Sequence, residues 1–223
     1  MAEGVMKTAI MVQARTGSTR LPRKILLPWN HKTVLGEVLE RCMATGFPVI
    51  LTVPYPDLGL ALFHEPCFVG HELDVLDRYY QTALVFGVLN IVRITADCPF
   101  VDPYTICKMV ELWDNGYGYD YLSNCHPIRT MDKGFDVEIF SFRALKQAWR
   151  ETPPQKHFRE HVTPYLYESG EFRLGTYRPE NYVMNGENYS IDTLDDYVRL
   201  QEVQELRNGT TYRRRTECQN CGY

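Results

Sequence analysis

Residues 9–24 read AIMVQARTGSTRLPRK, and this stretch decides the fold class. Its apolar start, Ala9–Val12, predicts a buried strand of the parallel-sheet type. The loop that follows combines small polar residues with four cations, Arg15, Arg20, Arg23 and Lys24. Backbone N–H groups of such a loop form an anion-binding concavity, and fixed cations neutralise the remaining charge. The stretch therefore predicts a strand that leads into a polyphosphate-binding loop.

The loop lacks the two best-known phosphate-binding patterns, because neither GxxxxGK(S/T) nor GxGxxG occurs in it. Clusters of Lys and Arg are usually solvated surface, and that is the alternative interpretation of these cations. The position of the loop directly after a buried strand favours ligand binding over a solvated surface.

The chain has 223 residues, 44% of them hydrophobic, which is enough for one large domain. We expect this domain to span residues 1–207, followed by a polar tail at 208–223. The net charge of −4 argues against general nucleic-acid binding, which needs a basic face. No segment approaches the ~20 consecutive apolar residues that cross a bilayer. We therefore expect no nucleic-acid or membrane partner. The N-terminus lacks a signal-peptide pattern and most cysteines stand singly, as reduced thiols do, so we expect a cytoplasmic protein.

In the first half of the chain, apolar segments typical of strands alternate with segments whose apolar residues have helical spacing. Strands are expected at 5–13, 48–53 and 89–94, and helices at 33–45, at 74–86 and from 103 onward. Asp74 and Asp102 precede two of these helices as N-caps. Residues 54–72 are rich in Pro and Gly and receive no assignment. The alternation predicts an α/β fold with a mainly parallel sheet between two helical layers.

The second half has shorter elements. Short strands are expected at 119–124, 135–140, 173–177 and 188–191, and helices at 142–150, 157–168 and 193–206. Pro164 is expected to interrupt the second of these helices. We interpret this half as a smaller mixed layer that completes the active-site cleft, not as an independent domain.

Two aspartates, Asp97 and Asp192, each follow a predicted strand directly. Ligands of parallel sheets bind at the carboxyl ends of the strands, so Asp97 and the polyphosphate loop point to one edge. Mg²⁺ prefers oxygen ligands and retains waters, so one or two carboxylates plus substrate phosphates suffice to hold it. If Asp97 and Asp192 meet, they form a Mg²⁺ site. The alternative is that each caps the turn or helix that follows.

Two further groups of potential metal ligands are weaker candidates. His157, Glu160 and His161 share one helical face, but no HExxH-type motif accompanies them, which favours surface or substrate contact over zinc. Cys218 and Cys221 form a lone CxxC, whereas a structural zinc site needs four ligands. A free or redox-labile tail is the default interpretation, and an intermolecular site is the alternative.

Residues 13–24 resemble the nucleotide loop of cytidylyltransferases related to CMP-KDO and CMP-sialic acid synthetases. The branch that they resemble most is that of spore coat polysaccharide biosynthesis. The resemblance continues in one order through Asp74–Tyr80, Arg93–Pro99, Gly134–Glu138 with Phe140–Phe142, Arg159–Pro164 and Ile191–Tyr197. Six matched segments are far more specific than any single motif.

The resemblance implies a Rossmann-like, glycosyltransferase A-type three-layer fold. It also implies an enzyme that uses CTP and Mg²⁺ to activate a small acceptor, with release of pyrophosphate, for surface polysaccharide or glycoconjugate precursors. By position, the catalytic residues would be Arg15, Lys24 and Asp97. The nucleotide-binding residues would be Ala14, Arg15, Gly17, Ser18, Lys24 and Arg78. Mg²⁺ would be held by Asp97 and Asp192, and the acceptor pocket would be lined by Asp136, Glu138, Glu160 and His161.

The chain departs from the family pattern at Arg23, where glycine is usual before the lysine. The stretch before Asp74 is also shorter than usual, so we expect one helix and one strand to be trimmed. Dimers are common in the family, which favours a homodimer. The acceptor stays open among nonulosonates, other sugars, sugar phosphates and small phosphorylated metabolites.

Two other functions stay open. One is a glycosyltransferase that uses a nucleotide sugar on the same fold, although the cations of the loop favour a nucleoside triphosphate. The other is a non-catalytic nucleotide-binding protein that docks through Arg213–Arg215 and the CxxC tail, although two candidate metal aspartates count against it.

Overall fold

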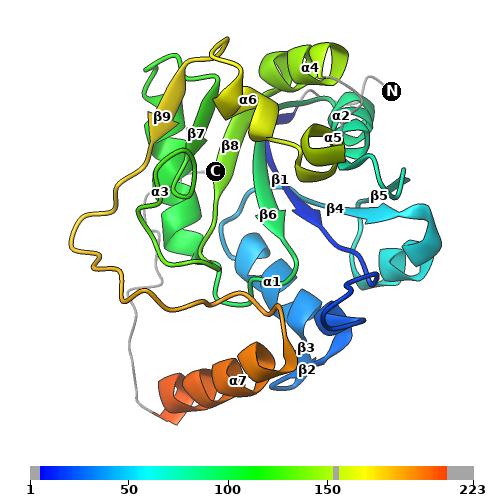
Figure 1. The fold of residues 1–223 in the computed structure, drawn as a ribbon, viewed down its shortest axis with the longest axis vertical. Helices are drawn as coiled ribbons and strands as arrows, with labels where there is room; N and C mark the ends of the chain where they lie inside the picture. The colour runs from blue at the N-terminus through cyan, green and yellow to red at the C-terminus, as the bar shows by residue number, and fades with distance from the viewer. Residues whose placement is uncertain (1–5, 153–155, 210–223) are drawn as a thin grey trace.

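A computed structural model describes residues 6–152 and 156–209 (Figure 1). The strands of its main sheet are β1 (Met6–Gln13), β4 (Val49–Pro54), β5 (Cys67–Gly70), β6 (Val88–Thr95), β7 (Tyr121–Ser123), β8 (Glu138–Ser141) and β9 (Leu174–Thr176). Their order is β5-β4-β1-β6-β8-β7-β9. Four neighbouring strands, β5, β4, β1 and β6, run parallel, and β8 runs antiparallel to β6 and β7. This mostly parallel sheet confirms the predicted α/β class.

Helices cover both faces of the sheet (Figure 1). They are α1 (Val34–Met43), α2 (Val75–Val85), α3 (Pro103–Asp114), α4 (Phe142–Glu151), α5 (Lys156–His161), α6 (Pro164–Glu168) and α7 (Leu194–Gly209), with the 3₁₀ helices η1 (Lys24–Leu26) and η2 (Tyr55–Phe63). Ile10 and Val12 of β1 belong to the core with α1 and α3, whereas Ala9 and Met11 belong to the core with α2 and α4. A strand buried on both faces thus produces the three layers of a Rossmann-like fold.

Three helices begin where the local sequence predicts. The side chains of Thr33, Asp74 and Asp102 accept N–H bonds at the starts of α1, α2 and α3, at 3.1, 2.9 and 3.1 Å. Each bond satisfies one of the backbone donors that a helix start leaves unpaired. Residues 54–72, which had no assignment, hold the 3₁₀ helix η2 and the strand β5.

The second half of the chain extends the main sheet instead of forming a layer of its own, because β8 pairs with β6 and β7 with β8. The predicted strand at 188–191 is wrong, since Asn188 makes only an isolated bridge with Lys133. Gly134, at φ +97°, explains this packing, because a Cβ there would lie 2.3 Å from the carbonyl carbon of Tyr189. The segment therefore crosses residue 134 by close backbone contact and does not continue as a ladder.

A third core joins α7 to the small hairpin of β2 (Pro28–Trp29) and β3 (Lys32–Thr33), at the lower edge of Figure 1. Trp29 packs edge-on against Phe100, with ring centroids 5.7 Å apart. Within the described ranges, no helix has both the length and the apolar character to cross a membrane. The tail from residue 210 onward, with Arg213–Arg215, Cys218 and Cys221, lies outside the described residues.

Candidate active site

The polyphosphate loop, residues 14–23, leaves the carboxyl end of β1 and folds around Thr16. The carbonyl of Thr16 accepts N–H bonds from Ser18 and Arg23, both at 2.9 Å. Arg23 takes the left-handed conformation, with φ 59°, and η1 starts at the next residue. This turn carries the chain from an exposed loop to Lys24, which is only 8% exposed.

Lys24, Asp97 and Asp192 form the Lys24 cluster at the carboxyl ends of β1 and β6. The Lys24 ammonium lies 2.6 Å from Asp97 Oδ2 and 3.2 Å from Asp192 Oδ1. Asp97 stands just past β6, and its carbonyl accepts the N–H of Ile191 at 2.9 Å. The structure thus brings together the two aspartates that were predicted to meet, and it places the lysine of the loop between them.

Asp192 has further cationic partners. Arg20 Nη2 lies 2.8 Å from Asp192 Oδ1, and Lys133 Nζ lies 2.7 Å from Oδ2. Burial opposes the negative charge, but the hydrogen bond from Lys133 and the charge of Lys24 outweigh it and lower the pKa of Asp192 to about 2. Asp192 is therefore ionised at neutral pH, in a place where cations gather.

The capping alternative does not describe either aspartate. Asp102, not Asp97, caps the helix that follows β6. At the start of α7, Asp196 accepts the N–H and O–H of Thr193 at 2.9 Å each, and the N–H of Asp192 at 3.2 Å. Since other residues cap these helices, the carboxylates of the Lys24 cluster are available for cations.

The polyphosphate loop is fixed to the protein at Ala14 and open to solvent around Arg15 and Gly17. Ala14 is buried, and its N–H donates to the carbonyl of Thr52 at 3.0 Å. Gly17 has no atom within 4 Å of the place that a Cβ would take. The Arg15 side chain is 49% exposed, and its guanidinium lies 3.7 Å from the Glu160 carboxylate. Around Arg15 and Gly17 the loop is therefore open to a ligand, on the side that faces α5.

Arg78 lies in α2 and is 1% exposed. Its guanidinium donates to the carbonyl of His71 at 2.6 Å. Burial lowers the pKa of Arg78, and the nearby charge of Arg15 adds to this lowering. These hydrogen bonds hold the turn before α2, and a direct contact between Arg78 and nucleotide stays a prediction.

Glu138 sits at the start of β8 and is 2% exposed. It accepts hydrogen bonds from Arg93, from the Tyr121 hydroxyl at 2.6 Å and from the Thr163 hydroxyl at 2.7 Å. Burial alone would raise its pKa, but the charge of Arg93 outweighs burial and lowers it. A carboxylate with three protein donors and a lowered pKa is a poor proton acceptor.

The other predicted acceptor residues lie nearer to solvent. Asp136 holds Arg129 in a bidentate pair at 2.6 and 3.0 Å. Glu160 faces the loop through Arg15. His161 is exposed overall, but partial burial of its ring lowers its pKa below the usual value of 6.5, so the imidazole is mostly neutral at pH 7. Neutral imidazole can accept a proton.

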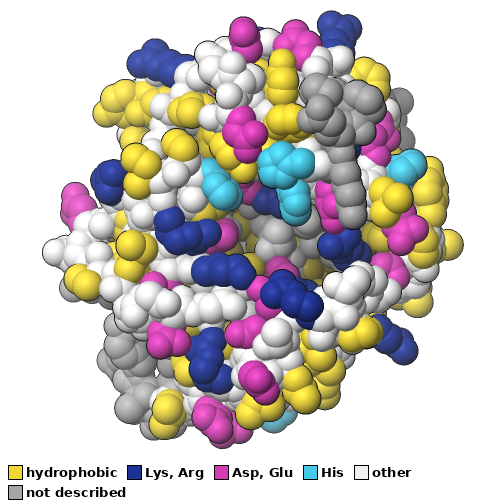
Figure 2. Space-filling model, in the orientation of Figure 1, with side chains coloured by type: hydrophobic (Ala, Val, Ile, Leu, Met, Phe, Trp, Pro, Cys, Tyr) yellow, Lys and Arg dark blue, Asp and Glu magenta, His cyan; other side chains and the backbone are white. Residues whose placement is uncertain are grey.

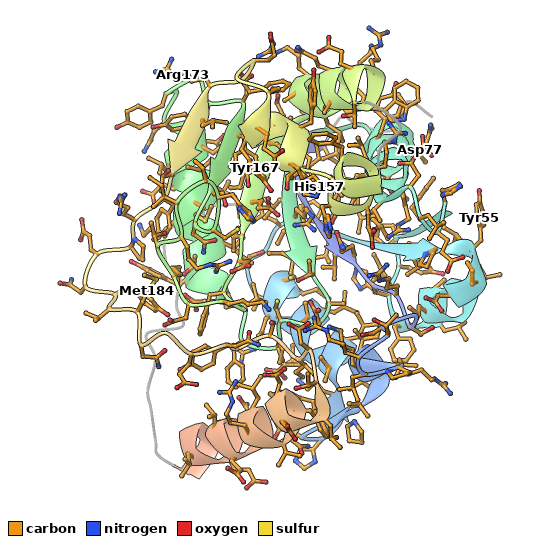
Figure 3. All side chains as sticks on the ribbon, in the orientation of Figure 1. Tyr55, Asp77, His157, Tyr167, Arg173 and Met184 are labelled. Carbon is orange, nitrogen blue, oxygen red and sulfur yellow. The ribbon has the colours of Figure 1, made fainter. Side chains whose placement is uncertain are left out.

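Basic and imidazole side chains surround an opening over this edge of the sheet. Figure 2 shows a hollow near the middle of the face, with Lys and Arg along its lower side and His above it. His157 of α5 and Tyr167 of α6 are labelled on the upper side in Figure 3. The ring of His126 stacks on that of Tyr167, with centroids 4.7 Å apart. The polar groups around the hollow come from both halves of the chain.

A comparison with known families matches residues 57–217, more than half of the chain, to the family described as cytidylyltransferase. The chain belongs to the cytidylyltransferase family. This confirms the resemblance carried by the six matched segments. An uncharacterized protein of Methanocaldococcus jannaschii is 35% identical over 90% of this chain and 84% of its own length.

Two further comparisons support this membership. The spore coat polysaccharide biosynthesis protein SpsF of Bacillus subtilis is 28% identical to this cytidylyltransferase, over 87% of this chain and 85% of the relative. A solved structure of a cytidylyltransferase from Leptospira borgpetersenii superposes with a TM-score of 0.79 at 30% identity, over 92% of this chain and 96% of that one. The comparisons therefore agree on family and on fold.

The Lys24 cluster of this cytidylyltransferase has the oxygen ligands that a hard divalent cation prefers. Its two carboxylates converge on one ammonium, so a single cation can reach both. Mg²⁺ needs only one or two carboxylates when waters and phosphates complete its shell. Within the part of the chain that the structure describes, no three His, Cys, Asp or Glu side chains converge on a metal site. The two aspartates thus suit a metal that arrives with phosphate ligands.

Sequence reasoning gave no role to Lys133 or Arg129 and named Arg20 only as a loop cation. Lys133 stands directly before Gly134, the start of a matched segment, and this was the signal that could have drawn attention to it. Arg20 and Arg129 are cations on exposed stretches. Because Arg20 meets Asp192 only through the fold, no local pattern marks it.

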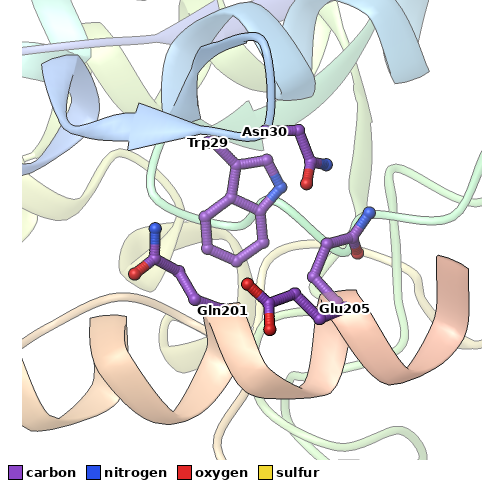
Figure 4. A pocket seen from close by; sticks show the side chains of 5 residues that line it. Trp29, Asn30, Gln201 and Glu205 are labelled. Atoms are coloured by element: carbon purple, nitrogen blue, oxygen red, sulfur yellow. The ribbon is translucent and has the colours of Figure 1, made fainter. Parts of the chain in front are cut away.

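A separate cavity of about 190 Å³ lies beside Trp29 and α7 (Figure 4). It is lined by Trp29, Asn30, Gln201, Gln204 and Glu205. None of these residues belongs to the polyphosphate loop or to the Lys24 cluster. Ligand pockets usually have roughly 300–1,000 Å³, so this cavity is small for a nucleotide and is not the candidate active site.

Proposed function

We propose that this cytidylyltransferase transfers CMP from CTP to a small sugar-like or phosphorylated acceptor, with Mg²⁺ as cofactor and pyrophosphate as the second product. The observation that carries the proposal is the Lys24 cluster, with its ammonium 2.6 and 3.2 Å from two carboxylates. It adjoins a loop that suits a triphosphate. The positive charge of the lysine suits the phosphates of a metal–triphosphate complex, and the negative charges of the two aspartates suit its metal.

The residues of the site act on charge and position. In-line attack on the α-phosphorus of CTP transfers negative charge to the leaving pyrophosphate, and such reactions depend on orientation and charge neutralisation. Lys24 and Arg15 supply that neutralisation from two sides of the loop. Asp97 and Asp192 would hold Mg²⁺, which when bound stabilises charge on phosphate oxygens. Lys24 then exchanges its carboxylate partners for phosphate.

The acceptor side of the site favours His161 over Glu138 as a proton acceptor. A phosphate or carboxylate acceptor is already anionic and needs no base, whereas a hydroxyl does. His161 is exposed and mostly neutral at pH 7, while Glu138 is buried under three hydrogen-bond donors. We therefore assign His161 the role of base for a hydroxyl acceptor, and Glu138 a role in holding the site.

The name of the Bacillus subtilis relative, 28% identical, supports a role in precursors of surface polysaccharides. A homodimer and a cytoplasmic location stay predictions.

The experiment that tests the proposal has two steps. First, thermal unfolding is followed with CTP, ATP, GTP or UTP, each with Mg²⁺ and with EDTA, because a ligand that binds only the folded state raises its stability. Second, pyrophosphate release from the stabilising nucleotide is measured with nonulosonates, sugars and sugar phosphates as acceptors.

We expect stabilisation by CTP that EDTA abolishes, and pyrophosphate release that needs one acceptor class. Equal stabilisation by all four nucleotides would remove the base preference. Stabilisation by nucleotide sugars but not by CTP would indicate a glycosyltransferase, and binding of CTP without turnover of any acceptor would indicate a binding protein.

A further inference from the structure

A carboxylate from outside the polyphosphate loop holds the centre of that loop. Asp57 Oδ2 accepts the backbone N–H of Thr16 at 2.7 Å, and Asp57 Oδ1 accepts the Thr16 hydroxyl. Both oxygens of one side chain thus bind both donors of one residue. Asp57 lies 41 positions away in the sequence, in the stretch that had received no assignment.

The backbone of η2 is shaped to present this carboxylate. η2 follows β4 directly and occupies the outer edge of the molecule, where Tyr55 is labelled in Figure 3. At Asp57 its backbone leaves helical geometry, with φ −105° and ψ 26°. The interruption of the helix therefore coincides with the residue that reaches the loop.

Thr16 is the residue around which the loop folds. Its carbonyl accepts the N–H groups of Ser18 and Arg23, and its own N–H and hydroxyl go to Asp57. The carbonyl of Thr52 in β4 accepts the N–H of Ala14. Both the start and the centre of the loop are thus fixed to the β4–η2 segment, before any ligand binds.

We propose that Asp57 is a positioning residue that pre-forms the polyphosphate loop for its nucleotide. The identity of the nucleotide rests on the function proposed above, whereas the anchoring of the loop does not. A loop that is ordered in advance spares the bound nucleotide the entropy of ordering it, and this appears as affinity. Loss of Asp57 should therefore weaken nucleotide binding more than it slows the bound complex.

The positive charge of Arg78 lies close enough to Asp57 to interact with it. Burial lowers the pKa of Arg78, and the carboxylate of Asp57 opposes that lowering from nearby. A negative charge beside a triphosphate would otherwise repel it. Asp57 can therefore act in two ways, by hydrogen bonding to Thr16 and by its charge acting on the ligand. Different variants can test the two roles separately.

The test uses Asp57→Ala, Asp57→Asn and Thr16→Val, with Asp114→Ala as a matched surface control. Asp114, the last residue of α3, pairs with Lys7 at the surface. The Asn side chain can accept the Thr16 N–H with its oxygen and donate to the Thr16 hydroxyl with its amide, so it keeps the anchor without the charge. Thr16→Val removes the hydroxyl bond alone.

Two readouts are measured for each variant. The dissociation constant for CTP with Mg²⁺ is obtained by calorimetry without acceptor, and hydrogen–deuterium exchange of the peptide 14–20 is followed without nucleotide. For Asp57→Ala we expect a dissociation constant raised about tenfold and faster exchange at 14–20. We expect Asp57→Asn and Asp114→Ala within about twofold of the unmodified chain and Thr16→Val near threefold.

An unchanged dissociation constant and unchanged exchange in Asp57→Ala would overturn the proposal. So would equal impairment in Asp57→Ala and Asp57→Asn, because the charge and not the anchor would then be responsible. If Asp57→Ala does not fold, Thr16→Val decides by the same two readouts. If the unmodified chain does not bind CTP, the proposed nucleotide is wrong, and exchange at 14–20 alone decides whether Asp57 anchors the loop.

Discussion

Two groups of buried charges lie at the same edge of the sheet, and their surroundings differ. In the Lys24 cluster, one ammonium is shared by two carboxylates, and Asp192 also meets Arg20 and Lys133. In the second group, the Glu138 network, one carboxylate is shared by Arg93, Tyr121 and Thr163. The first group joins two carboxylates to several cations, whereas the second joins one carboxylate to one guanidinium and two hydroxyl groups.

The difference shows which of the two can exchange partners. The cations of the Lys24 cluster sit on flexible side chains, two of which are half exposed or more, with 61% for Arg20 and 50% for Lys133. Arg93 and Glu138 instead face each other across paired strands β6 and β8. A metal and a triphosphate can replace the partners of the first group, whereas removal of Arg93 or Glu138 from the second leaves the other charge without its ion-pair partner. We therefore assign chemistry to the Lys24 cluster and stability to the Glu138 network.

The largest expected effect is on turnover, in Asp97→Ala. Pyrophosphate release with Mg²⁺ should fall by about 10³-fold or more, or roughly 4 kcal/mol of transition-state stabilisation. The free energy of unfolding should change by less than about 1 kcal/mol, because the Asp97 side chain is 25% exposed and Lys24 keeps Asp192 as a partner. Steady-state release and urea unfolding measure the two quantities. Near-normal turnover would remove the metal role, and Asp114→Ala is the control.

The next effect is on stability, in Glu138→Ala. The variant leaves Arg93 without its carboxylate and should lose about 3 kcal/mol of unfolding free energy. Glu138→Gln, which keeps the shape of the side chain, should lose less. Urea unfolding gives the stabilities, and turnover per folded molecule is measured at low temperature. If Glu138→Ala is stable but inactive, the contrast between the two groups is wrong and Glu138 belongs to the chemistry.

Acid titration tests how strongly the surrounding cations stabilise the charge of Asp192. The pKa of Asp192 is about 2 in the folded chain against 3.8 ordinarily, so its contribution is fully present above about pH 4 and is lost as the pH falls toward 2. The shift corresponds to about 2 kcal/mol. The decline in unfolding free energy between about pH 5 and pH 2 should therefore be smaller in Asp192→Asn by up to that amount. Equal declines in both chains would mean that the cations do not stabilise the Asp192 charge.

The sequence allowed the first half of the fold to be predicted because its signals are local. Residues Ala9–Val12 of β1 form an uninterrupted apolar run, and Asp74 and Asp102 cap the helices that they precede. The prediction of a strand at 188–191 was wrong for a reason that the local sequence does not contain. There the chain passes over Gly134 in a contact between distant backbones.

The candidate site divides in the same way. Arg15, Lys24 and Asp97 were predicted as site residues because they stand at ends of predicted strands or in a recognised loop. The bond of Lys24 to both aspartates, and the bond of Asp57 to Thr16, join residues that only the sheet order brings together. Residue types and spacing therefore predicted which residues belong to the candidate site. Which residue pairs with which could be seen only in the folded structure.

The smallest effect concerns Arg23, which adjoins Lys24 in sequence but contributes no atom to the Lys24 cluster. Its φ of 59° is a conformation that costs an L-residue roughly 1–2 kcal/mol and glycine almost nothing. Arg23→Gly should therefore raise the unfolding free energy by about 1 kcal/mol, while Arg23→Ala, which keeps the strain, should not. Turnover should stay within about threefold in both, since Arg23 is exposed. Equal stability of the Gly and Ala variants would exclude the backbone as the cause, and a large loss of turnover in both would add Arg23 to the cations that bind the nucleotide.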